Sequence, residues 1–331
     1  MVNASIPLLT TKSIAFVPVT ELDSLPGIEW LIEDVLPAQG LATLYGEPGH
    51  GKSFVSIDWA NHIAAGLPWH GKEVQKGTVV YIVAEGSRGM RDRMKAWRMA
   101  HPDADVSRSL VVLEPIMLHD TPALNRFINA VQKELKDAKP SLIIMDTLAQ
   151  NFVGGDENSA QDMGVWLHGA RILQEKFAST VLIVHHAARG TGRERGSTAL
   201  RGASDAMLLM TKPSARVNSY KLSCTKMKDG ECFGDVLFTI DPVEGSKSAV
   251  IRLAPANSAI EAAPGLPAGP SLDATVQTLA ASSMSLREGA KRLSEAFPEL
   301  TEIAAKGRIA RLRQKGTPVP GLVDLPEVSL V

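Results

Sequence analysis

The sequence predicts an α/β protein with a mostly parallel sheet, helices on both faces, antiparallel strands at one edge and a small helical unit near the C-terminus. Over residues 41–184, short apolar runs alternate with stretches of helical periodicity, as in βαβ units. These runs are continuously apolar, which is typical of strands buried on both faces. After residue 206 the apolar runs follow one another without room for helices, which favours antiparallel strands.

Each element is expected in the order of the chain. The parallel strands are predicted at residues 41–45, 79–84, 110–113, 141–145 and 180–184. Helices are predicted from Gly51, from Gly89, from Pro122 and over residues 160–177. Right-handed crossovers should join the parallel strands. The antiparallel edge strands are predicted at residues 206–210, 219–227 and 232–240.

The chain of 331 residues is long enough for one large domain and an appendage. Residues 1–27 carry Pro7, Pro18 and Pro26 without a sustained period, and we expect them to form a loosely packed arm. Residues 28–254 should form the main domain. Residues 255–271 are rich in Ala, Pro and Gly and predict a linker. Residues 272–331 should form the small helical unit, with helices near 273–282, 285–296 and 301–315.

The net charge excludes a protein that is basic throughout, and the hydropathy pattern excludes an apolar membrane span. Thirty-five Lys and Arg residues against 36 Asp and Glu residues give a net charge of -1, so a nucleic-acid site would have to be local. The first residues do not resemble a secretion signal, and no apolar run approaches the roughly 18 residues that span a bilayer. We therefore expect a cytoplasmic protein that has no membrane partner.

The two cysteines, Cys224 and Cys232, flank a predicted two-residue turn centred on Asp229 and Gly230. That turn would place Cys232 opposite Met227, with the two thiols on opposite faces of the sheet. We therefore expect two reduced thiols and no disulfide.

A phosphate-binding loop is the most specific motif in the chain. The pattern G-x-x-x-x-G-K-[ST] follows a predicted strand and precedes a predicted helix, which is the context that the motif requires. Its glycines let backbone N–H groups turn toward phosphates, the lysine reaches the terminal phosphates, and the hydroxyl ligates Mg²⁺. The motif comprises Gly46, Glu47, Pro48, Gly49, His50, Gly51, Lys52 and Ser53, and Phe54 follows it.

Two carboxylates end neighbouring predicted strands. Asp146 follows the run at 141–145 and suits the orientation of Mg²⁺ through its water shell. Glu85 follows the run at 79–84 and suits the activation of an attacking water. An alternative is that Glu85 only caps its strand, although carboxylates at this edge of a parallel sheet face the ligand crevice.

The order of these motifs resembles that of the RecA-like ATPases, and within them the DnaB-like and plasmid RepA-like hexameric helicases. The resemblance covers residues 30–240 and is carried by WLIEDVLPAQGLATLYGEPGHGKS, YIVAEGS, LIIMDTL and VLIVHHAARG. It implies ATP and Mg²⁺ as cofactors, Lys52 and Ser53 as phosphate and magnesium contacts, Glu85 as catalytic base and Asp146 as the second magnesium residue. His186 takes the place of a polar γ-phosphate sensor. The resemblance also implies a hexameric ring on single-stranded DNA or RNA, with a replication initiator or primase as a further partner.

Two adjacent histidines, His185 and His186, would also suit a metal pair. Neighbouring residues in a strand point to opposite faces, so the two rings cannot readily share one ion.

A basic loop follows these histidines. It contains Arg189, Arg193, Arg195 and Arg201 among glycines and small polar residues, with Glu194 as its single acid. In rings of the resembling family such loops line the channel and follow a single strand, which a mobile cationic segment suits. The alternative is a solvated basic loop, since it contains no aromatic residue for base stacking.

The resemblance also implies a cation that a neighbouring subunit inserts into each site. Lys226 and Lys228 stand where DnaB-like helicases have a Lys-x-Arg pair, and lysine lacks the planar fork of arginine. Arg201 and Arg216 are alternatives, and a finger outside this set also remains open.

Residues 301–315 concentrate positive charge on one predicted helix. A DNA contact, a solvated face and a subunit-docking helix all remain open for it. Its cations are Lys306, Arg308, Arg311, Arg313 and Lys315.

Taken together, the motifs predict an ATP-driven helicase or translocase for single-stranded nucleic acid in plasmid, phage or prophage replication. The alternative is a RecA-like ATPase in recombination or regulation that does not unwind DNA. A small-molecule phosphotransferase shares the phosphate loop but lacks an evident lid or acceptor site in the sequence.

Overall fold

The computed structural model describes residues 16–24, 27–136, 138–188, 194–213, 218–254, 276, 285–296, 306, 309 and 310. The chain divides into two compact units, Met1–Pro255 and Ala256–Val331. The predicted linker and the helices predicted near 273–282 and 301–315 lie wholly or mostly outside the described residues. In the second unit, α7 (Leu286–Ala296) corresponds to the middle of the three predicted helices.

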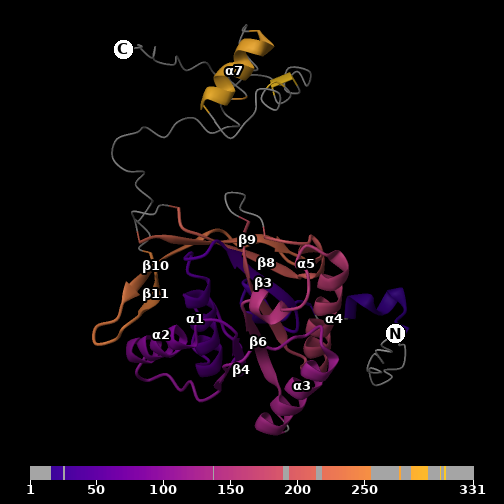
Figure 1. Cartoon of the computed structure of the whole chain (residues 1–331), viewed down its shortest axis with the longest axis vertical. Helices are drawn as coiled ribbons and strands as arrows, with labels where there is room; N and C mark the ends of the chain where they lie inside the picture. The colour runs from indigo at the N-terminus through magenta and orange to yellow at the C-terminus, as the bar shows by residue number, and fades with distance from the viewer. Residues whose placement is uncertain are drawn as a thin grey trace. The chain divides into compact units, whose positions relative to one another are not determined.

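A nine-stranded sheet forms the centre of the first unit, in the order β11-β10-β9-β8-β3-β7-β6-β4-β5 (Figure 1). Six neighbouring strands, from β8 to β5, are parallel, which confirms the predicted fold class. Their bounds are β3 (Leu41–Gly46), β4 (Thr78–Val83), β5 (Ser109–Val112), β6 (Pro140–Asp146), β7 (Thr180–His186) and β8 (Ala206–Thr211).

The antiparallel strands extend one edge of this sheet, as predicted, but they begin one strand later. β8 runs parallel to β3, whereas the sequence predicted it to be antiparallel. The connection over residues 187–205 is long enough for a parallel crossover and contains the short helix α5 (Ala199–Ala203). β9 (Tyr220–Met227) and β10 (Val236–Pro242) follow, and β11 (Ala249–Leu253) is a strand that the sequence did not predict.

Helices cover both faces of the sheet (Figure 1). α1 (Lys52–Ala65) and α2 (Ser87–Ala100) cover one face, and α3 (Thr121–Leu135) and α4 (Ala160–Phe177) cover the other. The period-two alternation of β4 explains the two cores: Val79 and Tyr81 point to the α1 side, whereas Val80 and Ile82 point to the α3 side. No helix among the described residues is long and apolar enough to cross a bilayer.

Short elements precede the sheet. They are a 3-10 helix η1 (Val19–Ser24) and a two-stranded sheet of β1 (Trp30–Ile32) and β2 (Leu36–Pro37). A second 3-10 helix, η2 (Ala149–Phe152), follows β6. Residues 16–21, which belong to the predicted arm, are exposed.

The connection between β9 and β10 differs from the tight turn that the sequence predicted. That turn would place Leu222 opposite Leu237, whereas Leu222 lies opposite Val236 and β10 begins only at this residue. The prediction that Cys224 and Cys232 lie on opposite faces of the sheet was wrong, because Cys232 lies in the connection before β10 and its side chain forms a hydrogen bond with Cys224. Both cysteines are free thiols. Burial and a hydrogen bond with Cys232 raise the pKa of Cys224 to about 12.

Candidate active site

The phosphate loop connects β3 to α1 at the carboxyl edge of the sheet. Gly46 ends β3, where a Cβ atom would lie 2.3 Å from the carbonyl oxygen of Met210 in β8, so a side chain at this position would clash. Gly51 has a φ of +83°, which places it in the left-handed region, and α1 begins at the next residue. The first turn of α1 therefore directs its N–H groups toward the loop, where an anion is favoured.

Lys52 holds its ammonium group against the loop. The side-chain nitrogen donates hydrogen bonds to the carbonyl oxygens of Gly46 at 2.9 Å and Glu47 at 3.0 Å. Burial lowers the pKa of Lys52 to about 8, although the negative charges of Asp146 and Glu85 oppose this shift. The lysine is thus a partly desolvated cation that faces two carboxylates, and a phosphate would offer it a stronger partner than neutral carbonyl groups.

The strand order explains how distant motifs meet. β3, β7, β6 and β4 are neighbours, and in their registers Gly46 lies beside His186, while Asp146 lies beside Val184 and Val83. Because these strands are parallel, the residues at their carboxyl ends share one edge of the sheet. Glu85 follows β4 by two residues and is exposed, and its charge acts on both Lys52 and His186.

Asp146 is buried and tied to the first turns of α1 through a chain of hydrogen bonds. Its Oδ2 accepts a hydrogen bond from the Tyr81 hydroxyl at 2.7 Å, and that hydroxyl lies 2.7 Å from the Ser56 hydroxyl. Ser56 in turn donates to the carbonyl oxygen of Lys52 at 3.1 Å. Burial raises the pKa of Asp146, although hydrogen bonds from Tyr81 and Ser53 oppose this shift. The chain therefore fixes the carboxylate relative to the phosphate loop.

The oxygen atoms of Ser53 and Asp146 fit a magnesium ion. Mg²⁺ prefers a few hard oxygen ligands and keeps several of its waters, which a hydroxyl next to a carboxylate allows. Ser53 forms a hydrogen bond with Asp146, so the hydroxyl group and the carboxylate are close enough to bind the same ion. Among the described residues, no group of three or more His, Cys, Asp or Glu side chains is arranged to hold a metal ion by itself.

His185 and His186 end β7 with different surroundings. His185 is fully buried, and its Nε2 lies 2.7 Å from the carbonyl oxygen of Arg195. Burial, together with the charge of Lys52, lowers the pKa of His186, which favours the neutral imidazole. The Nδ1 of His186 is buried and has no hydrogen-bond partner within the described residues. The charges of Glu85 and Asp146 also act on His186, as expected for a group beside the phosphate loop.

The described part of the basic loop is held by ion pairs within the chain. Arg195 pairs with Glu157 at 2.9 Å, and its side chain is 57% exposed. Arg201 pairs with Glu194 at 2.7 Å, and this partner raises the pKa of the guanidinium group. Arg201 also donates a hydrogen bond to Tyr45, the residue before Gly46. Arg189 and Arg193 lie outside the described residues.

The two candidate finger lysines differ in their contacts. The ammonium group of Lys226 donates to the carbonyl oxygens of Arg201, Gly202 and Ser204, at the C-terminus of α5. Lys228 is 61% exposed and lies 3.5 Å from a carboxylate oxygen of Asp205. Arg216, the further alternative, lies outside the described residues.

Sequence reasoning missed several residues at this site. Tyr81 and Ser56 appear in the sequence as ordinary members of a buried strand and a helix. Arg93 on α2 lies over the ring of Phe54, 5.1 Å from its centroid, and its charge acts on Asp146. The one signal for Tyr81 is a hydroxyl within an otherwise apolar strand, because buried hydroxyl groups require a partner.

The chain was compared with protein families, with curated proteins and with solved structures. A family model described as "AAA domain" matches residues 13–192. No curated protein sequence matches the chain. A KaiC-like protein from the hyperthermophilic archaeon Pyrococcus horikoshii OT3 is similar in structure, with 16% identity and a TM-score of 0.47, over 67% of this chain and 93% of that chain. The ATPase domain of G40P is also similar, with 11% identity and a TM-score of 0.46, over 61% of this chain and 81% of that chain.

Proposed function

The chain belongs to the AAA domain family. On that premise we propose that it is a RecA-like P-loop ATPase, which hydrolyses ATP to move along single-stranded nucleic acid as a ring. The proposed setting is the replication of plasmid, phage or prophage DNA, where strand separation would be its task. A hexameric ring, and a replication initiator or primase as partner, belong to the same proposal.

One observation carries the catalytic part of this proposal. The sheet brings the phosphate loop, Glu85, Asp146 and His186 to one edge, and the electrostatic influence of both carboxylates reaches Lys52 and His186. The parallel sheet brings these four strand ends to one edge, but folding does not require the residues there to be charged or polar. Convergence of a cation, a buried carboxylate and an exposed carboxylate is what phosphoryl transfer to water requires.

Each residue has a distinct role in the proposed reaction. Lys52 would exchange its carbonyl partners for the β- and γ-phosphate oxygens, and the exposed carboxylate of Glu85 would accept a proton from the attacking water. Magnesium would neutralise phosphate charge beside Ser53 and Asp146. The neutral His186 ring, with its unpartnered Nδ1, would hydrogen-bond to a phosphate oxygen or to the water.

The basic loop supports the nucleic-acid part of the proposal. The loop leaves β7 directly after His186, and the main chain of Arg195 donates a hydrogen bond back to the carbonyl oxygen of His186 at 3.0 Å. A change in the position of His186 upon hydrolysis would therefore be transmitted to the base of the loop. Arg189, Arg193 and Arg195 are the proposed phosphate-backbone contacts, whereas Arg201 would hold the loop through Glu194.

A second candidate function is supported by those same ion pairs. Arg195 and Arg201 both pair within the chain, and this lowers the positive charge that the loop offers to a nucleic acid. An ATPase in recombination or regulation that assembles in response to nucleotide, without unwinding, would suit this arrangement.

ATP hydrolysis with and without single-stranded DNA or RNA tests the proposal, together with strand displacement from a forked duplex. Glu85→Gln should bind ATP with magnesium and hydrolyse it roughly 10² to 10⁴ times more slowly, because it removes the general base. Glu114→Gln is the matched control, since Glu114 also follows its strand by two residues and is exposed. Lys52→Ala should lose nucleotide binding.

The outcomes separate the alternatives. Stimulation of hydrolysis by single strands together with duplex unwinding supports the motor. Hydrolysis without unwinding favours the second candidate. Normal turnover by Glu85→Gln would remove the assignment of the catalytic base.

A further inference from the structure

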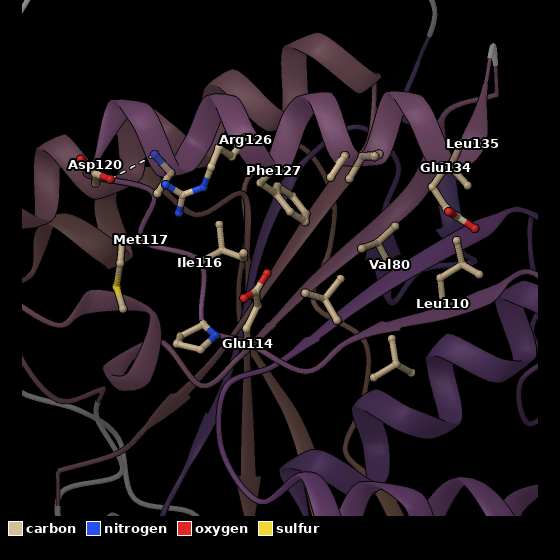
Figure 2. A pocket seen from close by; sticks show the side chains of 16 residues that line it. Val80, Leu110, Glu114, Ile116, Met117, Asp120, Arg126, Phe127, Glu134 and Leu135 are labelled. Carbon is tan, nitrogen blue, oxygen red and sulfur yellow. Dashed lines mark hydrogen bonds between the residues drawn. The ribbon is translucent and has the colours of Figure 1, made fainter.

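The groove between β5 and α3 lies outside the nucleotide site and is lined mostly by apolar side chains, with charged side chains among them (Figure 2). Cysteine, serine, threonine, histidine and lysine are all absent from the described residues that line it. This groove therefore offers contact area but no nucleophile. Outside the nucleotide site the chain has two cysteine thiols, Cys224 and Cys232, and thiols are strong nucleophiles.

The two thiols lie next to each other. Cys224 belongs to β9, its side chain is partly buried against the apolar core, and its thiol forms a hydrogen bond with Cys232. Cys224 also donates a hydrogen bond to the carbonyl oxygen of Lys226 at 3.4 Å, and the backbone N–H of Phe233 donates one to Cys224. Cys232 itself is exposed. The pair thus combines one thiol that a reagent can reach with a second thiol beside it.

Contacts outside the pair hold the connection between β9 and β10 in this position. The hydroxyl of Ser223 donates a hydrogen bond to the carboxylate of Asp235 at 2.6 Å. Ser223 directly precedes Cys224 and Asp235 closely follows Cys232, so this bond brings the two cysteines toward each other. Lys221 pairs with the same carboxylate at 2.8 Å. The proximity of the thiols therefore follows from the fold of this connection as well as from their own hydrogen bond.

We propose that Cys224 and Cys232 form a reversible disulfide within the chain, with a small disulfide such as oxidised glutathione as the reagent. The two sulfur atoms would have to approach from hydrogen-bond contact to the S–S bond length of about 2.05 Å. Cys232 lies in a connection and not in a paired strand, so it can make this approach without breaking the pairing of β9 with β10. Exposed disulfides are also open to reduction by small thiols, which makes the reaction reversible.

The reaction consists of two balanced steps. The thiolate of the exposed Cys232 attacks one sulfur of the reagent, so that a mixed disulfide forms and one small thiolate leaves. Cys224 then loses its proton and attacks the Sγ of Cys232, which forms the Cys224–Cys232 bond and releases the second small thiolate. In total the two protein thiols are oxidised, the reagent is reduced, and the two leaving thiolates take up the two protons.

The disulfide would close a ring of residues 224–232, which contains Lys226 and Lys228. These are the two lysines considered as cations for a neighbouring subunit. Thr225, in the same ring, has its hydroxyl 3.1 Å from the hydroxyl of Tyr45, the residue before the phosphate loop. Oxidation would therefore restrain a segment that contacts the nucleotide-binding strand. Formation of the disulfide requires neither the proposed action on nucleic acid nor a role of these lysines between subunits.

Peptide mapping of the full chain tests the proposal. The chain is equilibrated at several concentrations of oxidised glutathione with reduced glutathione held constant, its free thiols are blocked, and it is digested with trypsin without reduction. Cleavage after Lys221, Lys226, Lys228 and Lys247 separates residues 222–226 from residues 229–247, so only a disulfide can keep these two peptides together. The linked peptides should come from a chain that migrates as a monomer on a non-reducing denaturing gel, and reduction should separate them.

Single substitutions and unfolding provide the controls. Cys224→Ser keeps the exposed thiol and should stop at the mixed disulfide with glutathione, whereas Cys232→Ser keeps only the partly buried thiol and should react more slowly. The same titration in urea measures the contribution of the fold. The native chain should reach half-oxidation at a concentration of oxidised glutathione at least about tenfold lower than the unfolded chain, because the fold already holds the thiols together.

Three results would overturn the inference. The first is a wild-type chain that still carries the mixed disulfide at equilibrium and yields no linked peptides. The second is linked peptides that come from covalent dimers alone. The third is a native chain that needs as much oxidised glutathione as the unfolded chain, since the fold would then contribute nothing to the pairing of the thiols.

Discussion

At the scale of single residues, Lys226 shows how contacts revise a role suggested by position. Its three hydrogen bonds to carbonyl oxygens place a cation at the C-terminus of α5, where the helix dipole favours positive charge. A lysine that reaches a neighbouring subunit would have to break all three. Lys228 is largely exposed and would have to break an ion pair with Asp205.

This difference predicts separate effects for the two lysines. Lys226→Ala should lower the free energy of unfolding by about 1 to 2 kcal/mol, because hydrogen bonds from a charged group are lost. Lys228→Ala should change it by less than about 0.5 kcal/mol, as is usual for an exposed ion pair. Urea unfolding of both variants measures the difference.

Hydrolysis in mixed assemblies provides the control for the same pair. If either lysine acts across a subunit boundary, its alanine variant should regain activity when mixed with Glu85→Gln subunits that still donate the cation. Recovery for Lys226→Ala together with unchanged stability would contradict the structural role given to it here.

The residues that the sequence could predict are those whose position carries a signal. Lys52 belongs to a spaced motif, and Asp146 and Glu85 each interrupt an apolar run at a strand end. Tyr81 carries no such signal, because its partners Ser56 and Asp146 are 25 and 65 residues away along the chain. The ion pair of Arg201 with Glu194 could not be predicted from the sequence either, since a count of charges does not show which charged side chains contact each other.

At the scale of elements, α1 and α2 meet around a buried carboxylate. Asp58 on α1 accepts hydrogen bonds from the indole N–H groups of Trp97 on α2 at 2.7 Å and of Trp69 at 2.8 Å. His62, one turn further along α1, lies 3.5 Å from the same carboxylate. These contacts around Asp58 connect α1, which follows the phosphate loop, with α2, which follows Glu85.

Protonation of His62 should stabilise the contacts around Asp58 that connect α1 with α2. Burial would lower the pKa of His62, but the hydrogen bond and charge of Asp58 outweigh burial and raise it above the ordinary value of 6.5. A raised pKa means that the stabilisation is fully present below pH 6.5 and is lost as pH rises through the folded-state pKa. The rings of His70, Trp97 and His101 and the carbonyl oxygen of Leu67 also lie around His62.

Removal of the imidazole of His62 should therefore lower the free energy of unfolding by an amount that depends on pH. His62→Gln should destabilise the chain more at pH 5.5 than at pH 8.5, measured as the change in the free energy of unfolding relative to the wild type. His168→Gln, at an exposed position on α4, is the matched control and should show no such dependence. A cost for His62→Gln that is equal at both pH values, or larger at pH 8.5, would contradict the role of the ion pair.

Element types were predictable where the periodicity was strong, and their pairing was less so. The helix predicted over residues 160–177 is α4 with the same bounds, because Ser159 caps it and its apolar face is regular. The direction of β8 was missed, since an apolar run reads the same in parallel and antiparallel strands. The register of β9 with β10 was missed because an Asp-Gly pair that suggests a tight turn lies within a longer connection.

At the scale of the whole molecule, the chain consists of two units that each have a core of their own. The first unit, Met1–Pro255, contains the whole sheet and every candidate residue of the nucleotide site. In the second unit, Ala256–Val331, buried apolar side chains include Val276, Ala290, Leu293 and Ile309. Gly289 illustrates their packing, since a Cβ atom there would lie 3.3 Å from Ile309.

The separation predicts that the first unit folds and works without the second. A chain that ends at Pro255 should bind nucleotide and hydrolyse ATP as the full chain does, because every strand of the nine-stranded sheet and the phosphate loop lie before this residue. Its melting temperature should equal that of the main transition of the full chain.

Differential scanning calorimetry of the full chain should show a second, weaker transition, as expected for a unit of small size. A single cooperative transition in the full chain, together with a truncated chain that melts at a much lower temperature, would mean that the two cores stabilise each other and that the boundary at Pro255 does not separate independent folding units.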